Sequence, residues 1–127
     1  MQRRLWGKFM LNVGVNQAVA VYEADYGIIQ QEGPARDTMI AAMREVIALA
    51  KEEGVDLTEA DLPYWLSILE ALSPRGKPSM RQDLEAARHS EVALFSGAVL
   101  VLAEKHDLPC PVNQMLYDRI CEMERHF

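Results

Sequence analysis

The sequence has few cysteines and no surplus of basic residues, and each shortage excludes a class of protein. Cys110 and Cys121 are its only cysteines, and they form no metal-binding spacing with a second pair. Two cysteines in a chain of this apolar content are typical of reduced thiols, so we expect a cytoplasmic protein without a bound metal. The net charge of −6 disfavours nucleic acid as a partner, because binding phosphates takes an excess of Lys and Arg. A local basic pocket for a small anion is compatible with this charge.

Long apolar runs are lacking too. The longest one, residues 92–103, is interrupted by Ser96 and is shorter than the ~20 residues that span a bilayer. Residues 1–8 are basic, but the apolar region and small-residue cleavage site of a secretory signal do not follow them. We therefore expect no membrane contact and no secretory leader.

Apolar and polar residues do not alternate over any length, and helical spacing recurs instead. At 127 residues the chain is expected to be one domain. The sequence predicts an all-α fold, a helical bundle of about seven helices. Residues 91–106 are apolar on nearly all sides, so we expect them to form its central buried helix. The helices are expected near residues 2–15, 17–30, 34–53, 61–72, 80–88, 91–106 and 112–126.

Prolines and one glycine mark several helix ends. Pro34 and Pro111 fit the first position of a helix, where a missing N–H costs nothing. Gly54 is placed to end the helix before it. Pro63 would clash inside a helix, so we expect that helix to begin near Asp61 after a looser lead-in.

Three polar residues interrupt the apolar pattern of the first predicted helix. Lys8, Asn12 and Asn16 follow one another at i, i+4 spacing, which keeps them within roughly 80° of arc on one face. Asparagine is a weak helix former, so two of them among apolar residues need a reason. From the pattern alone they form a solvated stripe, a set of amides that hold neighbouring loops, or a binding surface.

Two further segments carry polar residues near predicted helix starts. The sequence S-M-R-Q-D-L-E begins at Ser79 and is followed by Arg88, Ser90 and Glu91. Further along, a Pro-x-Asn-x-x-Leu motif begins at Pro111. Taken singly, these segments are ordinary caps and turns.

The order of these motifs resembles the C-terminal domain of ketopantoate reductases. In that family the stretches commonly read K-x3-N-x3-N, S-M-x-Q-D-[LI], R-x-T-E-I-D-x-x-N-G and P-x-N-x-x-L. The resemblance extends from Leu5 to about Ile120. Each motif is weak by itself, but four of them in register are more specific.

The resemblance implies a fold and an activity. The fold would be like the helical C-terminal domain of 6-phosphogluconate dehydrogenases, placed after a Rossmann domain, with the active site between the two. The activity would be NADPH-dependent reduction of 2-dehydropantoate, a small 2-oxo acid, to pantoate in pantothenate biosynthesis. Lys8 matches the family's catalytic lysine and Glu91 its active-site glutamate. Asn12, Asn16 and Ser79 match its substrate-binding residues.

These residue types suit the reduction of a ketone. As hydride reaches the carbon, an ammonium such as Lys8 can stabilise charge on the oxygen and donate a proton. Amides at Asn12 and Asn16 can orient the substrate through hydrogen bonds. Ser79 at a helix start suits a carboxylate, and Glu91 could hold Lys8 in place.

Two features separate this chain from a complete enzyme of the family. The family's Asp and Asn in E-I-D-x-x-N-G are Ala93 and Ser96 here, which leaves another 2-oxo acid open as the substrate. No G-x-G-x-x-G motif follows a predicted strand. We therefore expect NADP to bind mainly to an N-terminal Rossmann domain that this chain lacks, and the isolated domain to be inactive.

The sequence leaves a non-catalytic alternative open. We expect a truncated or proteolysed piece of a longer protein, whereas a complete chain beginning at Met1 would favour a helical dimerisation module. The apolar face of residues 65–72 could form homodimer contacts, and it could equally pack inside the domain.

Overall fold

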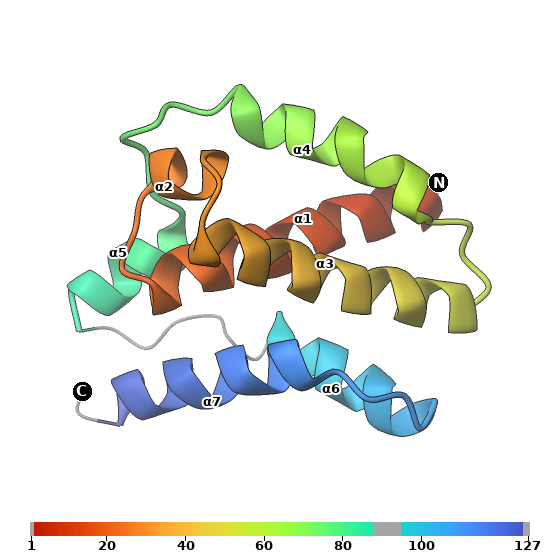
Figure 1. Ribbon diagram of the computed structural model, residues 1–127. Coiled ribbons are helices and arrows are strands. Elements are labelled where there is room, and N and C mark those ends of the chain that lie inside the picture. The colour runs from red at the N-terminus through yellow and green to blue at the C-terminus, as the bar shows by residue number, and fades with distance from the viewer. Residues whose placement is uncertain (1, 88–94, 126–127) are drawn as a thin grey trace.

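The computed structural model describes residues 2–87 and 95–125, which fold into helices without a strand (Figure 1). The prediction of an all-α bundle is thereby confirmed. The elements in chain order are α1 (Gln2–Val21), α2 (Tyr26–Gln30), α3 (Pro34–Glu52), the 3-10 helix η1 (Glu59–Asp61), α4 (Leu62–Glu70), α5 (Ser79–Glu85), α6 (Ser96–Lys105) and α7 (Pro111–Glu124).

The helices form three layers (Figure 1). Helices α1 and α3 run antiparallel to each other in the middle layer and pack along most of their length. Helix α4 lies on one side of this pair, and α6 with α7 lies on the other. Helices α2 and α5 gather at the end of the molecule where α1 ends.

The predicted break between residues 15 and 17 is wrong, because α1 is continuous to Val21. The second half of α1 is enclosed by its neighbours, and Val13, Ala18 and Val19 are buried. Burial on several sides favours continued helix, since tertiary packing contributes most of the stability of a helix in a protein. The helix ends where Glu23 adopts a positive φ of 51°.

The expectation of a central helix at residues 91–106 is also wrong for its described part. Residues 88–94 lie outside the described residues, and α6 begins at Ser96 in an outer layer. Its Val101 side chain is 69% exposed. The central helix is α1, which contacts α2, α3, α4, α5 and α7.

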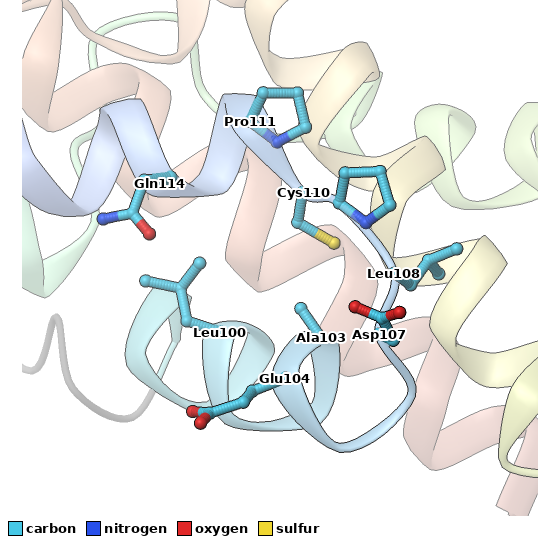
Figure 2. A pocket seen from close by; sticks show the side chains of 9 residues that line it. Leu100, Ala103, Glu104, Asp107, Leu108, Cys110, Pro111 and Gln114 are labelled. Atoms are coloured by element: carbon cyan, nitrogen blue, oxygen red, sulfur yellow. The ribbon is translucent and has the colours of Figure 1, made fainter.

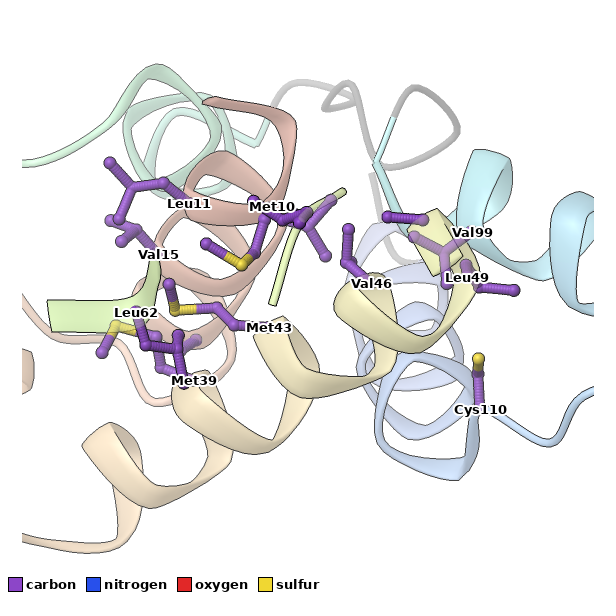
Figure 3. Close-up of a cluster of buried hydrophobic side chains, with 14 of the residues drawn as sticks. Met10, Leu11, Val15, Met39, Met43, Val46, Leu49, Leu62, Val99 and Cys110 are labelled. Carbon is purple, nitrogen blue, oxygen red and sulfur yellow. The ribbon is translucent and has the colours of Figure 1, made fainter. Parts of the chain in front are cut away.

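The core between α1 and α3 is filled by methionines (Figure 3). Met10, Met39 and Met43 are fully buried there, and their flexible side chains fill irregular gaps. Gly14 lets the two helices approach closely, because a Cβ on it would lie 2.6 Å from the Met43 side chain. Helix α3 begins at Pro34 and ends at Glu52, as predicted.

The Pro-x-Asn motif holds α7 to the middle layer. The Glu45 carboxylate of α3 accepts hydrogen bonds from the backbone N–H groups of Val112 and Asn113, at 2.8 and 2.9 Å. The buried Asn113 amide donates to the same carboxylate at 2.7 Å and to the Ala42 carbonyl at 3.3 Å. These contacts satisfy donors at the start of α7, which would otherwise lack partners. Within the described residues, Asn113 therefore has a structural role.

Candidate functional site

An open cavity of about 700 Å³ lies between α1 and α4. We call it the α1–α4 groove. Two of the predicted site residues, Lys8 and Asn12, line it. Its lining residues are Arg4, Leu5, Lys8, Leu11, Asn12, Tyr26, Tyr64, Trp65, Ile68 and Leu72.

The α1 wall of the groove carries three polar side chains beside Leu5 and Leu11. Arg4, Lys8 and Asn12 stand on successive turns of the helix, so their side chains share one face. Arg4 and Lys8 are exposed and Asn12 is half-buried. Among the described residues, neither cation forms an ion pair or hydrogen bond. Arg4 continues the predicted i, i+4 stripe by one turn toward the N-terminus, so its spacing could have revealed it.

The α4 wall is aromatic and aliphatic. The rings of Tyr64 and Trp65 meet edge to face with their centroids 5.2 Å apart, and Ile68 stands one turn further along α4. Trp65 and Ile68 also pack against the core, whereas Tyr64 is 60% exposed. The face of residues 65–72, left open between dimer contacts and internal packing, therefore packs partly inside and partly lines the groove.

An ion pair joins the start of α1 to the start of α4. The Arg3 guanidinium donates to the carboxylate of Asp61, which also accepts from the Thr58 N–H at 2.9 Å. These two donors lower the pKa of Asp61, Arg3 more than Thr58. Thr58 and Asp61 form a capping box around η1, and α4 begins at Leu62, close to the predicted start at Asp61. This end of the groove is held by directional polar contacts.

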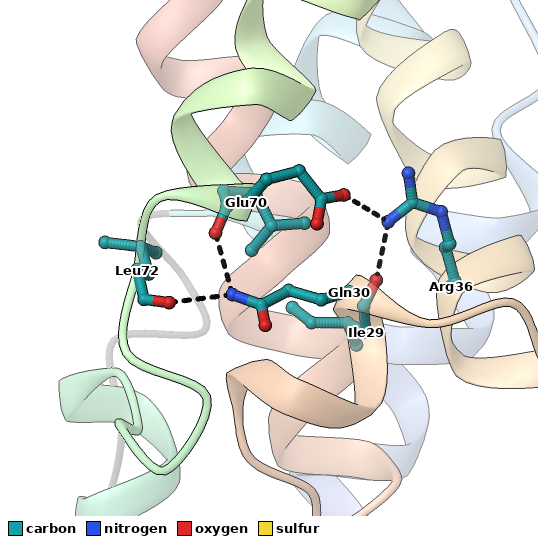
Figure 4. A network of polar contacts seen from close by, with 6 residues as sticks. Ile29, Gln30, Arg36, Glu70 and Leu72 are labelled. Atoms are coloured by element: carbon teal, nitrogen blue, oxygen red, sulfur yellow. Dashed lines mark hydrogen bonds and ion pairs between the residues drawn. The ribbon is translucent and has the colours of Figure 1, made fainter.

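The far end of α4 is held by α2 (Figure 4). The Gln30 amide donates to the carbonyls of Leu69 and Leu72, at 3.0 and 2.9 Å. Carbonyls at a helix C-terminus lack partners inside the helix, so this amide caps α4 from outside. Arg36 bonds the Ile29 carbonyl at 2.9 Å and the Glu70 carboxylate at 3.0 Å.

Tyr26 adds a phenol to the same end of the groove. Burial raises the pKa of Tyr26. Its backbone N–H donates to the Gly76 carbonyl at 3.0 Å, and its ring lies against Gly76. No local sequence pattern could have revealed this residue, because its place depends on how α2 packs against a distant loop.

The other predicted site residues are placed less completely. Asn16 is half-buried, one turn beyond Asn12 on α1. Ser79 is the first residue of α5, a helix that packs against α1. Glu91 and Ala93 lie outside the described residues.

Ser96 is fully buried, and its Oγ has no hydrogen-bond partner within the described part of the chain. Of the five predicted site residues, the described structure thus brings Lys8 and Asn12 onto one cavity.

A second cavity, of about 510 Å³, lies between α6 and α7 (Figure 2). The ionisable side chains among its described lining residues are Glu104, Asp107 and Cys110, and none of these residues is a cation. Burial raises the pKa of the Cys110 thiol to about 11, with a smaller contribution from the charge of Glu45. A cavity with this lining repels anions, so the α1–α4 groove is the better candidate for a 2-oxo acid.

Residues 1–124 match the family described as the C-terminal domain of ketopantoate reductase PanE/ApbA. The chain belongs to this family. The 2-dehydropantoate 2-reductase of Halobacterium salinarum is 33% identical over 119 residues, which make up 94% of this chain and 39% of that protein. The chain therefore spans about two fifths of the length of this ketopantoate reductase.

Solved ketopantoate reductases share the fold. The PanE/ApbA family structure from Ralstonia eutropha JMP134 is 26% identical, with a TM-score of 0.86 over 99% of this chain and 42% of that one. The structure of the dimeric enzyme from Staphylococcus aureus is 20% identical, with a TM-score of 0.89 over 98% of this chain and 44% of that one. Within the described residues, no helix is both long and apolar enough to cross a membrane.

Proposed function

We propose that this chain is the substrate domain of an NADPH-dependent 2-dehydropantoate 2-reductase, which converts ketopantoate to pantoate. The observation that carries the proposal is the shared cavity of Lys8 and Asn12, in a chain of the ketopantoate reductase family. Both side chains are free of hydrogen bonds to other described residues. They are therefore available to a ligand.

We place the cofactor on an N-terminal Rossmann domain in the full-length protein. The described residues contain no strand from which a Gly-rich phosphate loop could start. Their glycines serve other purposes, such as the close approach of α1 to α3 at Gly14. Bound NADPH would supply the hydride to the ketone carbon. The isolated domain is expected to be inactive for this reason.

The residues of this chain would act on the ketone oxygen. Negative charge builds on that oxygen as the carbon is reduced, and the Lys8 ammonium stabilises it and donates the proton. The Asn12 amide donates a hydrogen bond that fixes the orientation of the substrate. Asn16 and Ser79 are proposed as further substrate contacts. Glu91 is proposed as the carboxylate that orients Lys8.

The second candidate function is the reduction of a different 2-oxo acid. The replacement of the family's Asp and Asn by Ala93 and Ser96 favours it. A panel of 2-oxo acids offered to the full-length protein with NADPH separates the two candidates. The preferred substrate is the one with the highest kcat/KM.

Substitution of Lys8 tests both candidates. In the full-length protein, Lys8→Ala should lower kcat by about 10²- to 10⁴-fold, the usual contribution of a general acid, with little change in the midpoint of thermal unfolding. Lys51→Ala is a matched control, because Lys51 is an exposed lysine at the end of α3. A Lys8→Ala variant with normal turnover would show that the assignment is wrong.

A further inference from the structure

The α1–α4 groove is long and follows the polar stripe of α1. Arg4 and Asn12 both line it. They are eight positions apart, so at a rise of 1.5 Å per residue the stripe extends about 12 Å along the helix axis. The volume of about 700 Å³ falls in the range of sites that enclose a whole small ligand, roughly 300–1,000 Å³. A small, compact 2-oxo acid would contact only part of this length.

The α4 wall offers apolar surface along the groove. Trp65 and Ile68 stand beside the polar stripe, and Tyr64 and Leu72 are 60% and 37% exposed. Aromatic side chains are rigid and bury large areas, so they favour an aromatic or branched ligand group. The transfer of such a group from water to this wall is favourable.

The α1 wall adds positive charge to this apolar surface. Arg4 and Lys8 have no anionic partner among the described residues, although the chain as a whole carries a net charge of −6. A ligand that suits both walls is an anion with an extended apolar body. Tyr26 adds a phenol to the lining of the same groove.

We infer that the α1–α4 groove binds the side chain of an extended 2-oxo acid with an aromatic or branched apolar body, and that α4 selects for this group. The inference rests on the proposed function for the chemistry at Lys8. It goes further by naming the class of side chain and the wall that recognises it. Trp65 and Ile68 are then residues that determine specificity.

Two related substrates test this inference in the full-length protein with NADPH. The first, 4-phenyl-2-oxobutanoate, carries a phenyl group, and the second, 2-oxobutanoate, is the same acid without it. We expect kcat/KM to be at least about tenfold higher for the phenyl compound, because a single apolar group contributes that much discrimination in a matching pocket. Ile68→Trp should fill the groove and remove most of this preference.

Controls separate a filled groove from a general effect of the substitution. Met115→Trp introduces the same ring at a partly exposed position on α7, and the preference should persist. If Ile68→Trp does not fold, Tyr64→Ala removes part of the wall at an exposed position. That variant should reduce the preference severalfold.

Direct binding gives a readout that does not depend on turnover. The phenyl compound should quench tryptophan fluorescence saturably without NADPH. The quenching should persist in Trp6→Phe and should be reduced in Trp65→Phe, because Trp65 lines the groove. Quenching that is unchanged in Trp65→Phe would overturn the inference, since the ligand would then bind elsewhere.

The possible failures are distinguishable. If 2-oxo acids are reduced without a preference for the phenyl compound, the inference is overturned and the proposed function stands. If the phenyl compound quenches the fluorescence of Trp65 and no 2-oxo acid is reduced, the groove does bind this ligand and the proposed function is wrong. If there is no quenching and Ile68→Trp converts a dimer to a monomer in analytical ultracentrifugation, a second copy covers the groove and the inference is overturned.

Discussion

The indole of Trp65 lies directly against the backbone of Gly7, where a Cβ would come within 2.3 Å of the ring. Only a residue without a side chain allows this approach of α4 to α1. Gly7 directly precedes Lys8 in α1, so the contact places Trp65 close to Lys8 on the wall of the groove. The position of a candidate site residue thus depends on a glycine that has no chemistry of its own.

Gly7→Ala should destabilise the protein. Overpacking costs about 1–3 kcal/mol, which exceeds the gain of about 0.5–1 kcal/mol for alanine over glycine inside a helix. The free energy of unfolding in urea should therefore fall by about 1 kcal/mol. In a Trp65→Leu background the same substitution should be neutral or stabilising. An equal cost in both backgrounds would contradict the contact as the cause.

Asn113→Ala should be one of the more costly substitutions in α7. It leaves the half-buried carboxylate of Glu45 with one donor fewer and removes the acceptor for the buried Gln17 amide, 3.4 Å away. Loss of such a buried partner costs about 1–3 kcal/mol. The neighbouring Gln114→Ala, at an exposed position, should stay within about 0.5 kcal/mol of the unmodified protein in the same denaturation experiment.

Glu53 should contribute to the acid sensitivity of the fold. Its carboxylate accepts from the His106 ring and from Lys105 at 3.0 Å, and these bonds lower its pKa below the ordinary 4.5. A pKa that is lower in the folded state stabilises the fold above pH 4.5, and this stabilisation is lost as the pH falls through the folded-state pKa. Glu53→Gln should therefore make the free energy of unfolding fall less steeply below pH 4.5. Chemical denaturation at a series of pH values measures this change. Glu52→Gln changes an exposed neighbouring carboxylate, and it should leave the pH dependence of the free energy of unfolding unchanged.

The two cysteines should react at different rates with iodoacetamide. Burial raises the pKa of the Cys110 thiol from 9.0 to about 11, which lowers its thiolate fraction about a hundredfold at neutral pH. Cys121 is half-buried and should be labelled first. Mass spectrometry of the peptides should find Cys110 alkylated only after unfolding in guanidinium. Early labelling of Cys110 in the native protein would contradict its burial.

Local geometry made part of the site predictable. The i, i+4 spacing of Lys8 and Asn12 fixes their common face whatever surrounds the helix, and the structure places both on one groove. The aromatic wall was not predictable in the same way. It depends on α4 docking at Gly7, more than fifty residues away in sequence from Trp65, and no local pattern encodes that pairing.

The errors in the helix assignment have physical causes as well. A break between residues 15 and 17 was expected, but Val15, Gln17 and Ala18 are buried there, and burial among neighbouring helices favours continued helix. The apolar segment that includes α6 was expected at the centre because of its composition. Composition does not say which face a neighbour covers, and Val101 is left exposed.

Because α1 is enclosed by other helices, the α1 wall of the groove should tolerate fewer substitutions than the α4 wall. The helix that carries Lys8 and Asn12 packs against α2, α3, α4, α5 and α7, so most replacements along it disturb its packing against several helices at once. Tyr64 and Leu72 on the opposite wall are exposed, and replacing them leaves the middle layer intact. Directed evolution of substrate preference should therefore accumulate mutations on α4 while the first helix stays constant.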